Sequence, residues 1–220
     1  MLRVGLTGGL GSGKTTVAAI FRSLGAQLME ADAVARAMMQ PGEPVYAQIV
    51  QAFGPAVVRA GGTLDRRTLA QIAFTQGRLA ELNAIVHPPV IAEQRRWMEA
   101  LEREQPDAVA IYETALLFEA SKAAGTRDWQ QRFDRRILVT APEALRIARY
   151  VARIGGPGAD AATRAALEDE ARQRLAAQMP EEEKARLSDT IIRNDASLED
   201  VARQTEAVYQ ELRALAAVSR

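Results

Sequence analysis

The chain has 220 residues, which suits one large domain or one core with smaller inserts. Hydrophobic residues make up 48% of it, which excludes a disordered chain. Its 28 basic and 28 acidic side chains cancel, which argues against a general nucleic-acid-binding surface. Because the charges cancel, any phosphate-binding site must be local. The absence of cysteine excludes disulfides and thiol chemistry and fits a reducing cytosol.

The chain starts with a predicted strand, a glycine-rich loop and a helix. Residues 2–6 can form a buried strand, residues 8–15 read GGLGSGKT, and residues 16–21 have helical character. The loop fits the pattern G-x-x-x-x-G-K-[ST] in the strand–loop–helix context that this motif requires. Glycine tolerates positive φ angles and lets a phosphate approach the main chain, and the helix N-terminus adds N–H donors. The sequence therefore predicts a nucleotide-binding P-loop.

The P-loop side chains have distinct expected roles. We expect Lys14 to reach the β- and γ-phosphates and the hydroxyl of Thr15 to bind Mg²⁺. The residues expected to bind the nucleotide are Gly8, Gly9, Gly11, Ser12, Gly13, Lys14, Thr15 and Thr16. Because the predicted strand starts at residue 2, we expect no signal or transit peptide, and no apolar run reaches membrane-spanning length. These features predict a cytoplasmic protein.

Two acidic residues, Glu30 and Asp32, directly follow a second predicted strand over residues 26–29. Side chains that leave the carboxyl end of such a strand lie at the ligand-binding edge of an open α/β sheet. Phosphoryl transfer needs a carboxylate that orients the acceptor hydroxyl or takes its proton, and Asp32 is the first candidate. Glu30 would help to position Asp32 or a metal-bound water. Alternatively, both residues cap the following helix, since aspartate is a good N-cap.

Residues 34–103 change to mostly helical patterning. A new helix is predicted to start within residues 64–69, and the sequence HPP at residues 87–89 is predicted to break the pattern before a helix over residues 90–103. His87 is the single histidine of the chain. A histidine beside proline is more often a packed or capping residue than a base, and hydroxyl phosphorylation can use a carboxylate instead. Both interpretations of His87 stay open.

Strand character returns at residues 108–112 and 136–140. Glu113 follows the first of these strands, where an acidic residue in P-loop proteins often holds the water shell of Mg²⁺. Residues 116–118 are interpreted as core, whereas Glu119 can be either a structural or a functional carboxylate.

An arginine-rich helix follows the last of these strands, and it precedes a glycine-rich break at residues 155–158. Arg149 and Arg153 are four residues apart, so they share one helix face. Arginines beside a flexible break are typical of a lid that closes over phosphates. An exposed charged helix has the same pattern, and the sequence alone does not separate the two interpretations.

Strands alternate with helices, which predicts a parallel sheet with helices on both faces. A charged helix to about residue 178, a last short strand and loop over residues 189–194 and an amphipathic helix over residues 198–217 complete the pattern. The predicted fold class is an α/β P-loop NTPase with a three-layer parallel-sheet core, a helical insert and a lid. The expected parts are a core of residues 1–33, 105–141 and 186–220, an insert of residues 34–104 and a lid of residues 142–185.

Motifs that run through nearly the whole chain resemble the dephospho-CoA kinase family. They are residues 5–14, Ala31-Asp32 with Ala35-Arg36, Phe53-Gly54, Leu64-Asp65-Arg66, Ile85-Val86-His87-Pro88, Leu116-Leu117-Phe118-Glu119, Arg149 with Arg153, Ala176-Ala177-Gln178, Lys184, and Asp189 with Asn194. The P-loop alone would indicate only a superfamily. The Ile-x-His-Pro and Leu-Leu-Phe-Glu segments are much more specific.

The resemblance implies ATP-dependent phosphorylation of the 3′-hydroxyl of dephospho-CoA, the last step of coenzyme A synthesis, with Mg²⁺ as cofactor. It implies that the helical insert binds the acceptor and that Asn194 lies near the adenine of ATP. The expected catalytic residues are Asp32, Lys14, Arg149 and Arg153, and the expected substrate-binding residues are Asp32, His87, Arg36 and Glu119. The expected partners are ATP and dephospho-CoA, with no nucleic acid and no membrane, in a monomer or weak homo-oligomer.

The sequence departs from the family pattern at several places. Glu30 stands where an aspartate is usual, and Ala115 replaces the usual proline before the Leu-Leu-Phe-Glu segment. Ala196 stands where a glycine is common, and the stretches 120–131 and 155–163 look longer than usual. None of these changes touches the P-loop lysine, the candidate carboxylate Asp32 or the two lid arginines, so the expected activity is kept.

Two other functions compete with this one. Another P-loop kinase, acting on a nucleoside or nucleoside monophosphate, would have the same core and lid and would differ in the helical insert. A GTP-dependent switch would need an Asn-Lys-x-Asp loop to read guanine, and the chain contains no Asn-Lys pair.

Overall fold

The computed structural model describes residues 1–119 and 129–218, which form two compact units. The first unit combines Met1–Met29 with Leu101–Arg220, and the second unit is Glu30–Ala100. Residues 120–128, which include most of the first stretch expected to be longer than usual, lie outside the described part of the chain.

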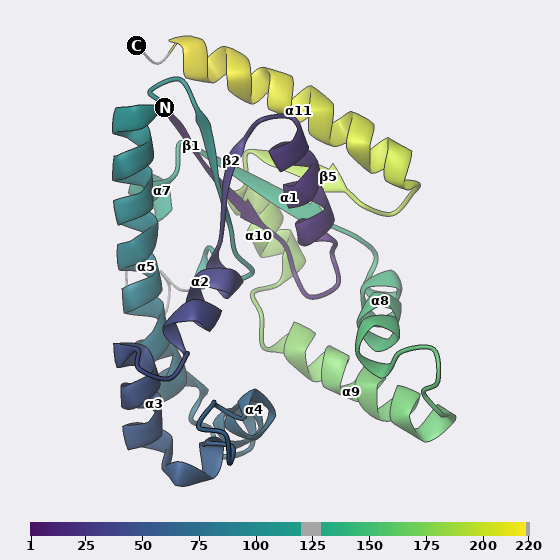
Figure 1. Ribbon diagram of the computed structural model, residues 1–220. Helices are drawn as coiled ribbons and strands as arrows, with labels where there is room; N and C mark the ends of the chain where they lie inside the picture. The colour runs from purple at the N-terminus through teal and green to yellow at the C-terminus, as the bar shows by residue number, and fades with distance from the viewer. Residues whose placement is uncertain (120–128, 219–220) are drawn as a thin grey trace. The chain divides into compact units, whose positions relative to one another are not determined.

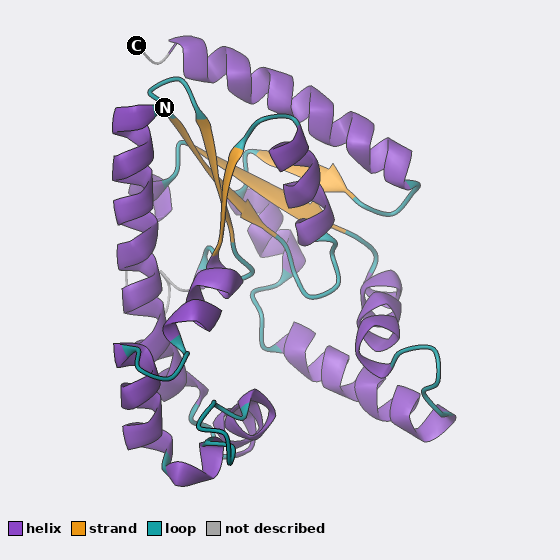
Figure 2. Ribbon diagram, in the orientation of Figure 1, coloured by secondary structure: helices purple, strands orange, loops and turns teal. Residues whose placement is uncertain are grey.

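The described residues of the chain form one five-stranded sheet in the order β2-β3-β1-β4-β5 (Figure 2). Its strands are β1 (Leu2–Thr7), β2 (Gln27–Glu30), β3 (Val109–Glu113), β4 (Arg135–Thr140) and β5 (Thr190–Arg193). The pairs β1–β3, β1–β4 and β4–β5 are parallel. The registers place Leu6 beside Glu113 and Thr140 beside Arg193, so the carboxyl ends of four strands share one edge. The five predicted strands are thus confirmed to within two residues at each end.

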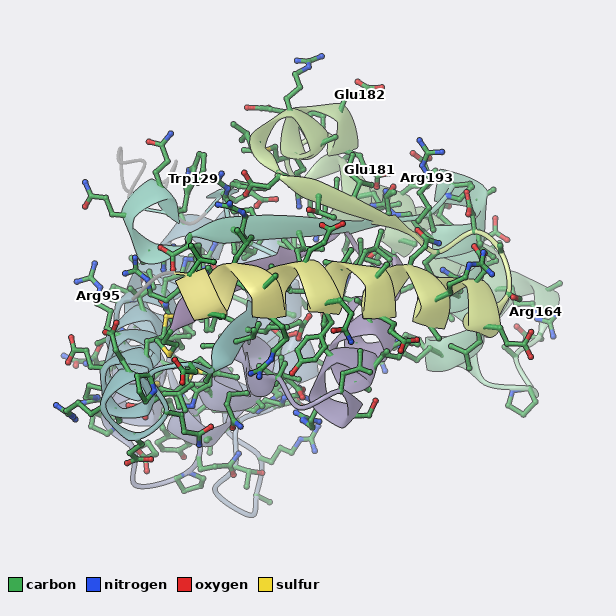
Figure 3. The ribbon with its side chains drawn as sticks, turned by 90° about the horizontal axis from the view of Figure 1, so that it is seen from above. Arg95, Trp129, Arg164, Glu181, Glu182 and Arg193 are labelled. Atoms are coloured by element: carbon green, nitrogen blue, oxygen red, sulfur yellow. The ribbon has the colours of Figure 1, made fainter. Side chains whose placement is uncertain are left out.

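Helices cover both faces of this sheet, which confirms the predicted α/β class. The helices of the first unit are α1 (Lys14–Ser23), α7 (Trp129–Arg132), α8 (Glu143–Gly155), α9 (Ala161–Ala176), α10 (Glu181–Leu187) and α11 (Leu198–Val218). Seen from above, α1 and α10 lie on opposite sides of the sheet (Figure 3). Val17 and Phe21 of α1 pack with Tyr209 of α11 against the apolar strand residues. Burying this apolar surface stabilises the fold by about 25 cal/mol per Å².

The second face of the sheet is tightly packed. A methyl group added to Gly5 of β1 would come within 2.5 Å of the side chain of Leu117 and 3.2 Å of the ring of Phe133. The ring of Phe133 stacks on Tyr112 of β3, with 6.0 Å between ring centroids. Residue 117 is therefore core, as predicted. The helices α7 and α10 on this side were not predicted.

The arginine-rich segment forms α8, and α9 follows it after the predicted glycine break (Figure 1). Gly156 ends α8 with φ +67°, a conformation that residues with a Cβ rarely adopt. Ile147, Tyr150 and Ala171 form the buried contact between the two helices, and Leu10 from the P-loop packs against them. The helix pair is therefore attached to the loop that was predicted to bind the nucleotide.

The second unit is helical, with α2 (Ala31–Met38), α3 (Pro44–Phe53), the 3-10 turn η1 (Pro55–Val57), α4 (Arg66–Thr75) and most of α5 (Leu79–Glu104). The helix α4 starts where the sequence predicts it. The side chain of Asp65 accepts hydrogen bonds from the backbone N–H groups of Arg67, at 3.0 Å, and Thr68, at 3.2 Å. These bonds satisfy two of the free donors at the start of the helix.

The predicted helix break at residues 87–89 is wrong. Pro88 and Pro89 lie inside the continuous helix α5. Proline removes backbone hydrogen bonds, which costs helix stability. Here Val86 and Val90, on either side of the prolines, are both buried, so packing holds the helix together across them. The cost of the prolines is offset by tertiary contacts that the local sequence does not show.

An ion pair ties the start of β4 to the residue before β5. The backbone N–H and Nε of Arg136 donate to one carboxylate oxygen of Asp189, at 2.7 and 2.8 Å, and Nη2 donates to the other at 2.5 Å. Partial burial alone would raise the pKa of Asp189, but the hydrogen bonds from Arg136 outweigh it, so the pKa lies below the ordinary 3.8. A depressed carboxyl pKa stabilises the fold above pH 3.8, and this contribution is lost as the pH falls through the folded-state pKa.

Asp189→Asn is expected to lower the free energy of unfolding by about 1–3 kcal/mol at pH 7, because it removes a charge from a hydrogen-bonded pair. The difference from the wild type should shrink below about pH 4. Urea unfolding at pH 7 and pH 3.5 measures both values. Asp169→Asn is the matched control, because Asp169 is 73% exposed and pairs with Arg172 on one helix. A deficit that is independent of pH would contradict the assignment.

Within residues 1–119 and 129–218, no helix combines the length and the apolar character that crossing a membrane requires.

Candidate active site

The P-loop has the backbone geometry of a phosphate cradle. Gly11 and Gly13 have φ values of +71° and +90°, and α1 begins directly after Gly13. The backbone N–H of Ser12 donates to the carbonyl of Gly9 at 3.2 Å, which closes the turn. A methyl group at Gly13 would collide with the side chain of Asn194, so this position also lacks space for a side chain. The backbone can thus present its N–H groups to an anion at the start of α1.

Lys14 and Glu113 lie side by side at the carboxyl edge of the sheet. The Nζ atom of Lys14 is 3.7 Å from Oε1 of Glu113, and the two side chains are 14% and 8% exposed. Thr15 and Thr16 are exposed in the first turn of α1. The hydroxyl of Ser12 is buried and, among the described residues, makes no hydrogen bond. A buried hydroxyl without a partner in a phosphate cradle suits a ligand oxygen.

A clamp holds the tip of the P-loop on both sides of one residue, Leu10. The backbone N–H of Leu10 donates to Oε1 of Gln178 at 3.2 Å, and its carbonyl accepts from Nε of Arg146 at 3.0 Å. Arg146 is 8% exposed, and its Nη1 is paired with the carboxylate of Glu181, which also accepts from the hydroxyl of Thr140. These contacts join α8 and α10 to the P-loop.

A second contact joins α8 to the P-loop through Asn194. The side-chain amide of Asn194 donates to the carbonyl of Ser12 at 2.8 Å, and its oxygen accepts from Nη2 of Arg149 at 3.2 Å. Nη1 of Arg149 also lies 3.5 Å from the carbonyl of Gly11. Arg149 and Asn194 are therefore placed at the P-loop, where phosphates would bind.

Arg153 has different surroundings from Arg149. It is exposed one turn further along α8, and its guanidinium lies 5.8 Å from the centroid of the Tyr150 ring. Arg174 lies 5.5 Å from the centroid of the same ring. The structure thus places one of the two predicted lid arginines against the P-loop and the other on an aromatic side chain of the helix pair.

A hollow of about 430 Å³ opens beside the clamp. It is lined by residues of β4, α8, α10 and the end of β5, among them Arg146, Glu181, Arg193 and Asp195. Glu181 and Arg193 are labelled in Figure 3. The hollow thus lies between α8 and the segment around Asn194, where the base of a nucleotide was expected.

Glu119 takes part in a buried ion pair. Its Oε1 is 2.7 Å from Nζ of Lys184 and accepts from the backbone N–H of Met179 at 3.1 Å. Lys184 is 1% exposed and also donates to the carbonyl of Ala115 at 3.2 Å. The other carboxylate oxygen, Oε2, is buried and, in the described part of the chain, has no hydrogen-bond partner. Glu119 thus anchors α10 with one oxygen and has acceptor capacity left on the other.

The remaining candidates, Asp32, Arg36 and His87, belong to the helical unit. Asp32 is exposed in the first turn of α2, and Glu30 is the N-cap residue, with no side-chain cap hydrogen bond. Nε of Arg36 donates to the carbonyl of Asp32 at 2.9 Å. His87 lies on α5, where burial lowers its pKa and so favours the neutral imidazole at pH 7. Asp32 does not occupy the N-cap position, which leaves its carboxylate free of that structural role.

Residues 2–200 match the sequence model of the dephospho-CoA kinase family. The chain belongs to the dephospho-CoA kinase family. The dephospho-CoA kinase of Moorella thermoacetica is 39% identical over 213 residues, which cover 96% of this chain and 92% of the relative. The dephospho-CoA kinase of Geobacillus kaustophilus is 37% identical over 215 residues, covering 97% and 98% of the two chains.

Solved structures have the same fold. TT1252 from Thermus thermophilus is 38% identical, with a TM-score of 0.70 over 96% of this chain and 97% of that one. A dephospho-CoA kinase from Campylobacter jejuni is 23% identical, with a TM-score of 0.65 over 96% of both chains, and supports the fold alone. The family resemblance expected from the sequence motifs is thereby confirmed.

Three residues of this dephospho-CoA kinase family member were not predicted to belong to the site: Arg146, Gln178 and Glu181. Arg146 precedes Arg149 by three residues, so helix periodicity places both on one face. That spacing is a signal from which Arg146 could have been found. Glu181 shows no such signal, because it contacts Arg146 from a different helix and lies 35 residues away in the chain.

Arg146→Ala is expected to raise the Kd for ATP about tenfold, because it removes a charge-assisted bond that holds the P-loop carbonyl. Titration with a fluorescent ATP analogue measures the change. Arg172→Ala is the control, because Arg172 is 52% exposed and its ion pairs are with residues of its own helix. Equal affinities in both variants would show that the clamp does not organise the loop.

Proposed function

We propose that this chain transfers the γ-phosphoryl group of ATP to the 3′-hydroxyl of dephospho-CoA, giving coenzyme A and ADP in the last step of coenzyme A synthesis. The observation that carries the proposal is a complete P-loop, with Lys14 beside Glu113, in a chain whose residues 2–200 match the dephospho-CoA kinase family. The family defines the acceptor, and the loop geometry defines the donor site.

On the donor side, the backbone N–H groups of residues 8–16 bind the phosphates of ATP, and Lys14 neutralises charge on the transferred group. The hydroxyl of Ser12 is a further donor toward a phosphate oxygen. Asn194 and Arg149 hold the loop and border the nucleotide, and the hollow beside Arg193 has room for the adenine. Donors that are fixed by such contacts favour transition-state stabilisation.

The donor set at the P-loop fits Mg²⁺. Mg²⁺ in phosphotransferases takes one or two protein oxygens, substrate phosphates and waters, not an all-protein cage. The exposed hydroxyl of Thr15 and the carboxylate of Glu113 are such oxygens, and the described residues contain no group of three or more acidic or histidine ligands. When bound, Mg²⁺ offsets the negative charge of the phosphates. We assign Thr15 as its direct ligand and Glu113 to its water shell.

On the acceptor side, Asp32 orients the 3′-hydroxyl of dephospho-CoA and takes its proton as the oxygen attacks phosphorus. The bond to the γ-phosphorus forms at the 3′-oxygen, the bond to the bridging oxygen breaks, and ADP leaves. Arg36, Glu119 and the neutral imidazole of His87 are further acceptor contacts. Arg149 and Arg153 stabilise the charge on the transferred group when residues 142–185 close as a lid.

We place the reaction in the cytoplasm, in a monomer or weak homo-oligomer, with a core of residues 1–33, 105–141 and 186–220 and an acceptor-binding insert of residues 34–104. A coupled assay with purified protein, ATP, Mg²⁺ and dephospho-CoA tests the proposal, with mass spectrometry of the product. We expect one phosphate added to dephospho-CoA and none to AMP or adenosine. Phosphorylation of a nucleoside monophosphate without any product from dephospho-CoA would show a different P-loop kinase.

A further inference from the structure

Three arginines from three segments of the helical unit line one hollow of about 360 Å³. Arg36 comes from α2, Arg59 from the loop after η1, and Arg66 is the first residue of α4. All three are exposed. The guanidinium group binds phosphate oxygens with two parallel N–H bonds, so convergent arginines favour a phosphate ligand.

The charge around this hollow is not balanced by protein carboxylates. Among the described residues, the lining contains no aspartate or glutamate. Asp65 is the nearest acid in sequence to Arg66, and its Oδ1 lies 3.5 Å from Nη2 of Arg59. That carboxylate already accepts hydrogen bonds from the first N–H groups of α4. The bond from the backbone N–H of Thr68 is the main reason that the pKa of Asp65 is lowered. Three positive charges with one ionised acid leave a local excess of two.

Arg66 and Arg36 are held together although they repel each other. Nη2 of Arg66 lies 3.5 Å from the carbonyl of Arg36, at the end of α2. Partial burial and the charge of Arg36 lower the pKa of Arg66. A bound anion would relieve this repulsion. Capping of α2 by Arg66 would use only one weak hydrogen bond of the five N–H donors on its guanidinium, which leaves the other donors for a ligand.

We propose that this hollow binds the diphosphate group of dephospho-CoA. The proposal rests on the proposed function, in which Asp32 faces the 3′-hydroxyl of the same ribose. Arg36 follows Asp32 by four residues on α2, so the two share a helix face and lie about 6 Å apart along the axis. The diphosphate is attached at the 5′-carbon, across one ribose ring from the 3′-oxygen. The local excess of two positive charges matches the two negative charges of a diphosphate diester.

Steady-state kinetics of the double variant Arg59→Gln with Arg66→Gln tests the assignment. The KM for dephospho-CoA is expected to rise at least about tenfold, because two charge-assisted contacts are lost. The KM for ATP and kcat should stay within about threefold, since the change lies outside the P-loop. At saturating ATP, inorganic pyrophosphate should compete with dephospho-CoA in the wild type and about tenfold more weakly in the double variant.

The control variant is Arg67→Gln, which removes the same charge from the next residue of α4. Arg67 is exposed and does not line the hollow, so kcat and both KM values of the Arg67→Gln variant should match those of the wild type. An unchanged KM for dephospho-CoA in the double variant, or an equal rise in both KM values, would overturn the assignment. If the double variant melts early, the single variant Arg59→Gln gives the same test, because Arg59 is 61% exposed.

A separate measurement distinguishes failure of the hollow from failure of the proposed function. If the wild type forms no product from dephospho-CoA, the function is wrong, and the hollow is then tested by calorimetric titration with pyrophosphate. The Lys14→Ala variant is used because we expect its P-loop to bind phosphate poorly, and it should still bind pyrophosphate at the hollow. The added Arg59→Gln and Arg66→Gln changes should weaken this binding about tenfold. Equal binding in both proteins, or none in either, would reject the anion site.

Discussion

Lys14→Ala is expected to lower kcat by about two to three orders of magnitude, the usual cost of removing one preorganised donor from the transition state. The Nζ atom has to neutralise charge that develops on the transferred phosphoryl group, and no other lysine lies in the P-loop. The fold should persist, because the loop is held by other hydrogen bonds: Leu10 donates to Gln178 and accepts from Arg146, and Ser12 accepts from Asn194. Single-turnover kinetics at saturating ATP and a thermal melt measure the two effects.

Lys14→Arg is the informative comparison for this prediction. It keeps the positive charge beside Glu113 but replaces a compact ammonium with a planar guanidinium of different reach. We expect the arginine variant to retain the melting temperature of the wild type while recovering little of the lost turnover. A kcat of Lys14→Ala within about tenfold of the wild type would remove the lysine from the transition state altogether.

The parts of the site that could be predicted from sequence are those made by neighbouring residues. The P-loop is such a part, because its strand, its glycines and the start of α1 lie within residues 2–23. Gly11 and Gly13 have the positive φ angles that the motif demands. The N-cap of α4 by Asp65 is local in the same way. Short-range patterns of this kind are complete in the sequence and need no tertiary information.

The contacts that hold the P-loop tip could not be predicted in this way. Leu10 bonds to Arg146 and Gln178, which lie 136 and 168 residues away in the chain. The sequence shows polar residues on predicted helices at both places, but a solvated helix face has the same pattern. Which of these side chains turns inward depends on how α8 and the connection between α9 and α10 pack against the P-loop, and only the fold decides that.

The same reasoning explains the error at α5. Two consecutive prolines are a strong local signal for a helix break, and the sequence contains nothing that opposes it. The opposing contribution is the burial of Val86 and Val90, which is a tertiary effect. Local rules fail at this segment because long-range packing outweighs propensity.

Asp32→Asn is expected to lower kcat by about two to four orders of magnitude, since the amide cannot accept the proton of the acceptor hydroxyl. ATP affinity should not change, because the P-loop groups are untouched. The melting temperature should also stay the same, because Asp32 is exposed and does not occupy the N-cap position of α2. Glu30→Gln is the matched control, an amide replacement two residues earlier at the N-cap, and we expect it to retain most turnover.

Near-normal kcat in Asp32→Asn, together with a large loss in Glu30→Gln, would transfer the proton-accepting role to Glu30. Proton inventories and the pH dependence of kcat in the two variants distinguish a base from a residue that only orients the hydroxyl. Loss of a base removes the acidic limb of the pH profile of kcat. Loss of an orienting group lowers kcat at every pH.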